Sequence, residues 1–115
     1  MTTAADISLE RNGHALVARL RGEVDMTNAS FVREELTSSV PNDAHALVID
    51  LTDTRYLDSA AIEVLFELSR RLGRRRQELL LVVPPGSPLR RMLTLTDVGA
   101  VAPMHESLAE ALDGA

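Results

Sequence analysis

Cysteine, lysine and tryptophan are all absent from this chain of 115 residues. Without cysteine, the protein can form no disulfide bond, no thiolate metal site and no covalent intermediate on a thiol. Without lysine, it has no side chain that can form a Schiff base with a carbonyl substrate. These absences exclude several classes of enzyme before any motif is considered.

Long apolar segments are missing as well. The N-terminal residues 1–8 contain neither a basic region nor an apolar run, so we expect no signal peptide. No apolar run approaches the ~20 residues that a membrane-spanning helix needs. The formal net charge of −5 argues against general nucleic-acid binding. We therefore expect a cytoplasmic protein with no nucleic-acid partner and no membrane partner.

Basic side chains gather at one place in this acidic chain. Arg70, Arg71, Arg74, Arg75 and Arg76 crowd the end of a predicted helix. The simplest interpretation is that they complement the negative end of the helix dipole and keep that end solvated. A phosphate-binding patch is the alternative, but no aromatic residue is interleaved with these arginines.

The histidines show no pattern of a metal site. His14, His45 and His105 lie far apart in the sequence, and no two of them have the spacing of metal ligands. We interpret each as a surface or strand-edge residue. The glycines are isolated, so no phosphate-binding glycine loop is present. The sequence therefore predicts neither a metal nor a cofactor.

Four aspartates follow predicted strands. Asp25, Asp50, Asp53 and Asp58 would lie near the carboxyl edge of the sheet, where an acidic cluster could hold Mg²⁺ as in a phosphoacceptor receiver domain. Receivers also use a lysine, which is missing here, and they begin with a βαβ unit instead of a hairpin. We interpret these aspartates as turn and cap residues. The sequence shows no set of residues arranged for catalysis, so we expect the protein not to be an enzyme.

The central stretch, residues 47–72, organises the chain. It opens with the apolar run Leu47-Val48-Ile49, which is typical of a strand buried on both faces. Asp58 and Ser59 then offer two successive N-caps for a long amphipathic helix, and Glu67 precedes Arg71 at ion-pair spacing. We place the function at the head of this helix, residues 57–62. The predicted buried stripe consists of Ala61, Val64, Leu65, Leu68 and Leu72.

The order of elements indicates a single α/β domain over residues 1–115. Its sheet is mixed and mostly parallel, begins with an antiparallel hairpin at Asn12-Gly13, and is covered by about four α-helices. The predicted elements are, in order, strands 7–10 and 15–20, a helix capped by Thr27 or Asn28 and ending near Val40, strand 47–49, the long helix closed by Gly73, strand 79–83, a helix after the Ser87-Pro88 cap, a short edge strand 98–101, and a helix 108–112 with a Ser107/Glu110 capping box.

Four segments together resemble the STAS family, which includes anti-sigma factor antagonists and the tails of sulfate transporters. Gly22-Glu23-Val24-Asp25 resembles the family's G-E-hydrophobic-D motif after the second strand. Residues 49–51 with residues 57–62 resemble its D-L…-D-S-[S/T/A]-G-L signature, and residues 87–93 and 107–112 resemble its last two helices. The resemblance implies a STAS-like fold over nearly the whole chain.

The resemblance also implies a function. A bacterial antagonist of this type binds an anti-sigma factor, which is a serine-protein kinase of the histidine-kinase-like ATPase fold, and so frees a sigma factor for transcription. Phosphorylation of a hydroxyl residue at the head of the long helix cancels this binding. The position of that phosphoacceptor is occupied by Ala60, and Ser59 precedes it. We expect Ser59 to serve mainly as a helix cap, with phosphorylation of Ser59 as the alternative.

We expect one partner-binding surface around the head of the long helix. Ile62 and Phe66 lie off the buried stripe, so they are either partly exposed apolar anchors or a widening of the core face. Other functions stay open: a STAS subunit of a lipid-transport ATPase complex, or a scaffold in stress signalling. The expected surface consists of Asp25, Thr27, Asp58, Ser59, Ala60, Ile62, Glu63 and Phe66.

Overall fold

The chain begins with the predicted antiparallel hairpin. The computed structural model describes residues 5–113, in which β1 (Ala5–Asn12) pairs with β2 (Ala15–Val24). Gly13 and His14 form the turn, and Gly13 takes a φ of 58°, which glycine adopts without strain. The hairpin prediction at Asn12-Gly13 is thus confirmed, with the turn one residue further along the chain.

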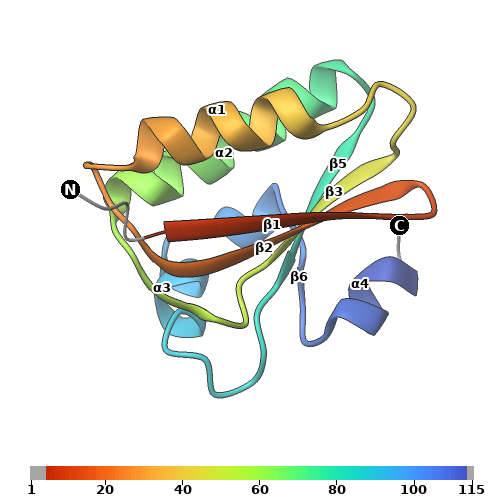
Figure 1. Ribbon diagram of the computed structural model, residues 1–115. Helices are drawn as coiled ribbons and strands as arrows, with labels where there is room; N and C mark the ends of the chain where they lie inside the picture. The colour runs from red at the N-terminus through yellow and green to blue at the C-terminus, as the bar shows by residue number, and fades with distance from the viewer. Residues whose placement is uncertain (1–4, 114–115) are drawn as a thin grey trace.

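Parallel strands extend the sheet from β2 (Figure 1). The order is β1-β2-β3-β5-β6, and β4 pairs with the end of β2 beyond the part that pairs with β3. The added strands are β3 (Ala46–Asp50), β4 (Thr54–Leu57), β5 (Glu78–Val82) and β6 (Met104–His105). The mixed, mostly parallel sheet predicted from the sequence is therefore confirmed.

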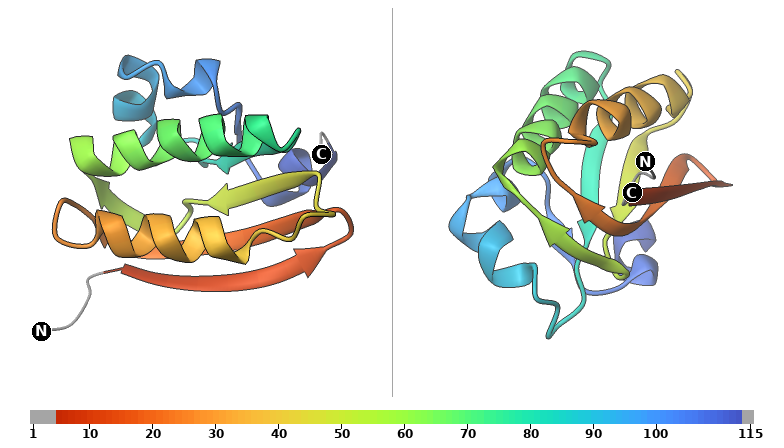
Figure 2. Two further views of the ribbon diagram at one scale, coloured as in Figure 1. Left: turned by 90° about the horizontal axis from the view of Figure 1, so that it is seen from above. Right: turned by 60° about the vertical axis from the view of Figure 1, so that its left-hand side comes forward.

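Helices cover both faces of this sheet. α1 (Ala29–Ser39) and α2 (Ser59–Arg74) lie side by side over one face, and α3 (Arg90–Leu95) packs at the same face. α4 (Leu108–Asp113) covers the opposite face, where Ala111 packs against β2, β3 and β5 (Figure 2). The predicted α2 stripe is buried at every position, so the helical periodicity identified the core correctly.

Two strand predictions need correction. β4 was not predicted, because the segment after Asp50 has no alternating pattern and becomes a strand only by pairing with β2. The edge strand expected at 98–101 is a 3₁₀ helix, Val98–Ala100, in which the Val98 carbonyl accepts from the amides of Val101 and Ala102. The edge strand is instead β6, where the Leu81 amide donates to the Pro103 carbonyl at 2.9 Å.

The ends of two helices also differ from expectation. Gly73 lies inside the last turn of α2, and the helix is closed three residues later by Arg76, which has a φ of 58°. α3 begins at Arg90 and not at Pro88, because the Ser87 hydroxyl accepts from the Leu89 amide at 3.2 Å and forms a turn ahead of the helix.

The cap of α4 is close to the expected capping box. The Ser107 hydroxyl accepts from the Glu110 amide at 3.1 Å, as predicted. The Glu110 carboxylate reaches back to the amide of Glu106 at 3.3 Å, one residue before the expected partner. In the part of the chain that the structure describes, no helix combines the length and the apolar character needed to cross a membrane.

Candidate functional site

Asp58 positions the head of α2. It follows β4 in an extended conformation, with φ −102° and ψ −171°, and its Oδ1 accepts from the Ala61 amide at 3.1 Å. Ser59 is therefore the first residue of the helix, and its side chain is exposed. The expectation that Ser59 serves as the cap is wrong, because Asp58 already occupies the capping position.

The loop between β2 and α1 is held by its own side chains. Asp25 Oδ1 accepts from the Thr27 amide at 2.9 Å and from the Thr27 hydroxyl at 2.5 Å. These hydrogen bonds from Thr27 lower the pKa of Asp25 below its ordinary value of 3.8. Asn28 is buried and bonds backwards along the chain, to the Asp25 amide at 3.0 Å and the Glu23 carbonyl at 2.9 Å. It occupies the N-cap position of α1 without using its side chain as a cap.

The loop and the helix head are joined through one carboxylate. Asp58 Oδ2 accepts from the Met26 amide at 3.1 Å, while the Asp58 amide donates to the Val24 carbonyl at 3.2 Å. The end of β2, the following loop and the start of α2 therefore form one preformed surface. This contact connects the two halves of the expected binding surface, which are about thirty residues apart in the sequence.

Three of the four aspartates, Asp25, Asp50 and Asp58, serve as turn and cap residues. Asp50 Oδ1 accepts from the Thr52 amide at 3.0 Å and from its hydroxyl at 2.5 Å, repeating the geometry of Asp25 and Thr27. Over residues 5–113 there is no cluster of three or more histidine, aspartate or glutamate side chains that could hold a metal ion. Asp25, Asp50 and Asp58 thus each accept hydrogen bonds from nearby amides.

Ile62 and Phe66 differ in exposure. Ile62 retains only 7% of its accessible surface and belongs to the core, so for Ile62 the widened core face is confirmed and the partly exposed anchor is not. The core widens here because β4 and α3 flank α2, and Leu57 and Met92 lie beside Ile62. Phe66 is half-buried against the same core and keeps part of its ring accessible.

Two open hollows flank the head of α2. One, of about 610 Å³, lies between α1 and α2, and half-buried Ala60 is part of its lining. The other, of about 630 Å³, lies between β4, α2 and α3, and Ser59 is part of its lining. Glu63 and Phe66 line both hollows and so form the ridge between them. The structure thus places Ala60 and Ser59 on opposite sides of one ridge.

Sequence reasoning missed two exposed apolar side chains that line the hollows beside this ridge. Met26 is 79% exposed and Tyr56 is 50% exposed. Met26 lies between Asp25 and Thr27, so an apolar residue inside a polar loop is the signal that could have identified it. Exposed apolar side chains beside a hollow are typical of a surface that binds another protein.

Two histidines come together elsewhere. The rings of His14 and His45 stack with centroids 4.3 Å apart and an interplanar angle of 11°. Both are exposed, as expected. They meet because parallel pairing of β2 with β3 places them in the same row of the sheet. Because the two histidines are far apart in the sequence, the sequence pattern did not predict this contact.

The described geometry and the sequence comparison define the protein family. Residues 6–111 match the STAS domain family, so the chain belongs to this family. The anti-sigma-F factor antagonist RsfB of Mycobacterium tuberculosis is 30% identical over 105 residues, covering 91% of this chain and 84% of that protein. The crystal structure of an anti-sigma factor antagonist from Mycobacterium paratuberculosis has a TM-score of 0.84 and 25% identity, covering 96% of this chain and 92% of that one.

A second similar structure is that of the Bacillus cell fate determinant SpoIIAA in its phosphorylated form. It has a TM-score of 0.66 and 19% identity, and the match covers 95% of this chain and 98% of that one. At this identity the similarity shows the shared fold. The chain is therefore a STAS domain whose named relatives are anti-sigma factor antagonists, which are regulatory binding proteins.

Proposed function

We propose that this protein is an anti-sigma factor antagonist that binds its anti-sigma factor through the α2-head surface. This surface consists of Asp25, Thr27, Asp58, Ser59, Ala60, Glu63 and Phe66, with Ile62 supporting it from the core. The observation that carries the proposal is the double contact of Asp58, which fixes the β2–α1 loop against the head of α2. A surface that is ordered before binding loses little conformational entropy on association.

The partner that the resemblance implies is a serine-protein kinase of the histidine-kinase-like ATPase fold. Binding would release a sigma factor in the bacterial cytoplasm, and the antagonist would act by association and not by catalysis. The exposed Met26 and the half-buried Phe66 supply apolar anchors, while Asp25, Asp58 and Glu63 make the surrounding surface acidic. An apolar centre with a charged rim is the usual anatomy of a specific protein interface.

Ala60 determines how such binding is regulated. Its methyl group lacks a hydroxyl, so it cannot accept a phosphate group. Phosphorylation of a residue here would add roughly −1.5 to −2 charges to the surface that meets the partner. Without that group, we expect binding to be constitutive. Ser59 has an exposed hydroxyl, but it lies on the other side of the ridge and is the less favoured position.

Calorimetric titration tests the proposal. The anti-sigma factor is first recovered from the native host with the tagged protein as bait and is then purified. Ala60→Glu places a carboxylate in the first turn of α2, where the helix dipole favours it, so the fold should be retained. Affinity should fall by at least about tenfold, because an unpaired charge at an interface is costly.

Ala109→Glu is the matched control. Ala109 is exposed on α4, over the opposite face of the sheet, so this variant adds the same charge away from the α2-head surface. Equal affinities of a folded Ala60→Glu protein and the control would refute the proposed surface. Recovery of a transporter ATPase or of a stress-signalling scaffold, in place of an anti-sigma factor, would refute the proposed partner.

A further inference from the structure

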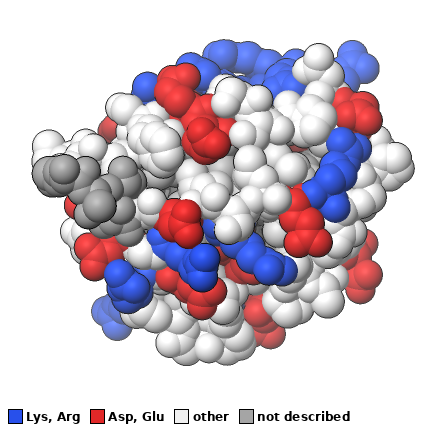
Figure 3. Space-filling view, in the orientation of Figure 1, with Lys and Arg blue, Asp and Glu red and all other residues white. Residues whose placement is uncertain are grey.

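Arginines are concentrated at the C-terminal end of α2. The cluster contains Arg70, Arg71, Arg74, Arg75 and Arg76, although the chain as a whole has a net charge of −5. In Figure 3 blue atoms gather along the upper edge of the molecule, where Figure 1 places α1 and, behind it, the C-terminal end of α2. This is the opposite end of the helix from the α2-head surface.

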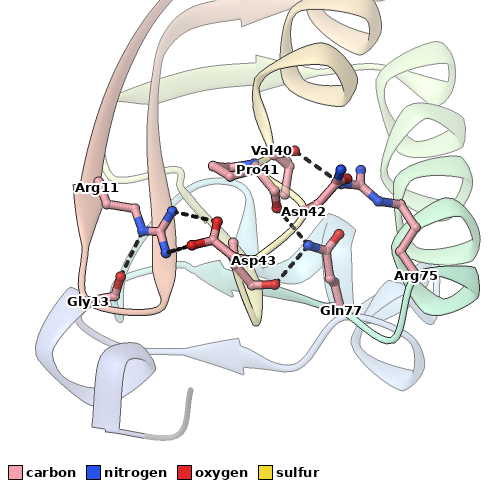
Figure 4. Close-up of polar contacts among 9 residues, drawn as sticks. Arg11, Gly13, Val40, Pro41, Asn42, Asp43, Arg75 and Gln77 are labelled. Carbon is pink, nitrogen blue, oxygen red and sulfur yellow. Dashed lines mark hydrogen bonds and ion pairs between the residues drawn. The ribbon is translucent and has the colours of Figure 1, made fainter.

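Only two of these five side chains have partners within residues 5–113. Arg71 forms an ion pair with Glu67 at 3.8 Å, which confirms the predicted helical pair. Arg75 donates to the Val40 carbonyl at 3.2 Å and to Asn42 Oδ1 at 2.6 Å (Figure 4). In the described part of the chain, the side chains of Arg70, Arg74 and Arg76 form neither an ion pair nor a hydrogen bond, and all three are exposed.

The helix dipole accounts for only part of the cluster. Its effect is confined to the last turn, which contains Arg71 and Arg74. Arg70 precedes that turn and stands four residues before Arg74, at the spacing where like charges repel each other.

Arg76 occupies a position where its backbone conformation is unfavourable. The amides of Gln77 and Arg76 donate to the carbonyls of Leu72 at 2.8 Å and Gly73 at 3.1 Å, which is the hydrogen-bond pattern of a Schellman motif. Arg76 occupies the left-handed position of this motif with φ 58°, where glycine is strongly preferred. A strained residue that keeps a free guanidinium group indicates a function that outweighs the strain.

We propose that Arg70, Arg74 and Arg76 form a binding surface for an acidic segment of a partner protein. Three unpaired guanidinium groups match the carboxylates of such a segment by charge and by hydrogen-bonding geometry. The surface begins at Arg70, which lies one helical turn, or about 6 Å along α2, beyond Phe66 and lines the same hollow between α1 and α2 as Ala60. None of the three arginines belongs to the α2-head surface, so this surface is proposed on residues of its own.

Other anionic partners fit this surface less well. Single-stranded nucleic acid is bound through aromatic side chains, and no aromatic residue follows Phe66 in the chain. The net charge of −5 also repels any long polyanion. A membrane-binding helix adds apolar side chains beside its basic ones, whereas Leu72, the only large apolar residue between Arg70 and Arg76, is buried.

Fluorescence anisotropy with a labelled peptide of alternating glutamate and serine tests the proposal at low salt. Arg70→Gln/Arg74→Gln should weaken binding roughly five- to tenfold, as expected for the loss of two exposed charge pairs. The matched control is Arg55→Gln/Arg91→Gln, which removes the same charge from exposed arginines of β4 and α3 and should change affinity less than about twofold. Arg76→Gly should also weaken binding, although it relieves backbone strain, so its effect on binding is separable from its effect on folding.

Three outcomes would overturn the proposal. The first is failure of the wild-type protein to bind the acidic peptide at low salt. The second is an equal loss of affinity in both double variants, which would indicate an effect of net charge alone. The third is tighter binding to duplex DNA, or to vesicles containing phosphatidylglycerol, than to the peptide, which would assign the surface to a different class of partner. None of these experiments uses the anti-sigma factor, so their failure leaves the proposed function standing.

Discussion

The Asp58 carboxylate accepts a hydrogen bond from the Met26 amide at 3.1 Å and so ties the β2–α1 loop to the head of α2. Its other oxygen caps the helix through the Ala61 amide, also at 3.1 Å. One side chain thereby satisfies donors from two segments that are distant in the sequence. The relative position of the loop and the helix, and with it the α2-head surface, depends on this residue.

Replacing Asp58 should destabilise the fold. Asp58→Ala removes the N-cap of α2 and the acceptor for Met26, so we expect the free energy of unfolding to fall by about 1–2 kcal/mol. Urea denaturation followed by circular dichroism measures the change. The neighbouring Ser59→Ala is the control and should change stability by less than about 0.5 kcal/mol, because Ser59 is exposed and outside the cap. A larger loss in Ser59→Ala than in Asp58→Ala would contradict the assigned cap.

The C-terminal end of α2 should tolerate two stabilising substitutions. Gly73 lies inside the helix with open space where a Cβ would be, so Gly73→Ala should raise the free energy of unfolding by about 0.5–1 kcal/mol. Arg76→Gly should raise it by up to about 1 kcal/mol, because glycine removes the strain at φ 58°. Thermal or urea denaturation of each variant provides the measurement. A decrease in stability for both variants would mean that the helix end is not as described.

The Asp25–Thr27 pair should contribute a pH-dependent term to stability. The pKa of Asp25 is lowered in the folded state, so its contribution is present above the unfolded value of 3.8 and is lost as the pH falls through the folded value. Thr27→Val removes the hydroxyl donor and should move the pKa of Asp25 back toward its ordinary value. NMR titration of the Asp25 carboxyl carbon measures this shift directly.

The matching stability experiment compares wild type with Thr27→Val at neutral pH and at about pH 2. The difference in unfolding free energy between the two proteins should be largest at neutral pH and should shrink in acid. Thr94→Val is the control, since the Thr94 hydroxyl donates to the Arg90 carbonyl and, among residues 5–113, to no carboxylate. A Thr27→Val protein with an unchanged Asp25 pKa would disprove the role given to the hydroxyl group.

Gln77 and Arg75 both donate hydrogen bonds to the loop between α1 and β3, and Gln77 should contribute more to stability (Figure 4). Its buried side-chain amide donates to the Pro41 carbonyl at 2.9 Å and to the Ala44 carbonyl at 2.8 Å. Gln77→Leu should therefore cost about 1–3 kcal/mol, because buried acceptors lose their donor. Arg75→Gln removes the exposed guanidinium group that bonds to the same loop, and it should lower the free energy of unfolding by less than about 1 kcal/mol. The opposite ranking in urea denaturation would count against this assignment.

The local sequence pattern identified the hairpin, the buried strands and the apolar stripe of α2 because each depends on neighbouring residues. Alternation and helical spacing place Leu16, Ala18 and Leu65 on core-facing sides of their elements whatever the remote partners are. The same holds for Ser107, which bonds to an amide three residues away. These features were predictable at the level of one strand or one helical turn.

The tertiary structure decided the features that need a second segment. β4 is a strand only because the end of β2 lies beside it, and Ile62 is buried only because β4 and α3 flank α2. The sequence itself determined an α/β domain with a hairpin, a capped amphipathic helix and an alanine, Ala60, in the first turn of that helix. Which side chain caps that helix, and what stands beside Ala60, depended on contacts across the fold, because hydrogen bonds and burial follow distance in space and not distance along the chain.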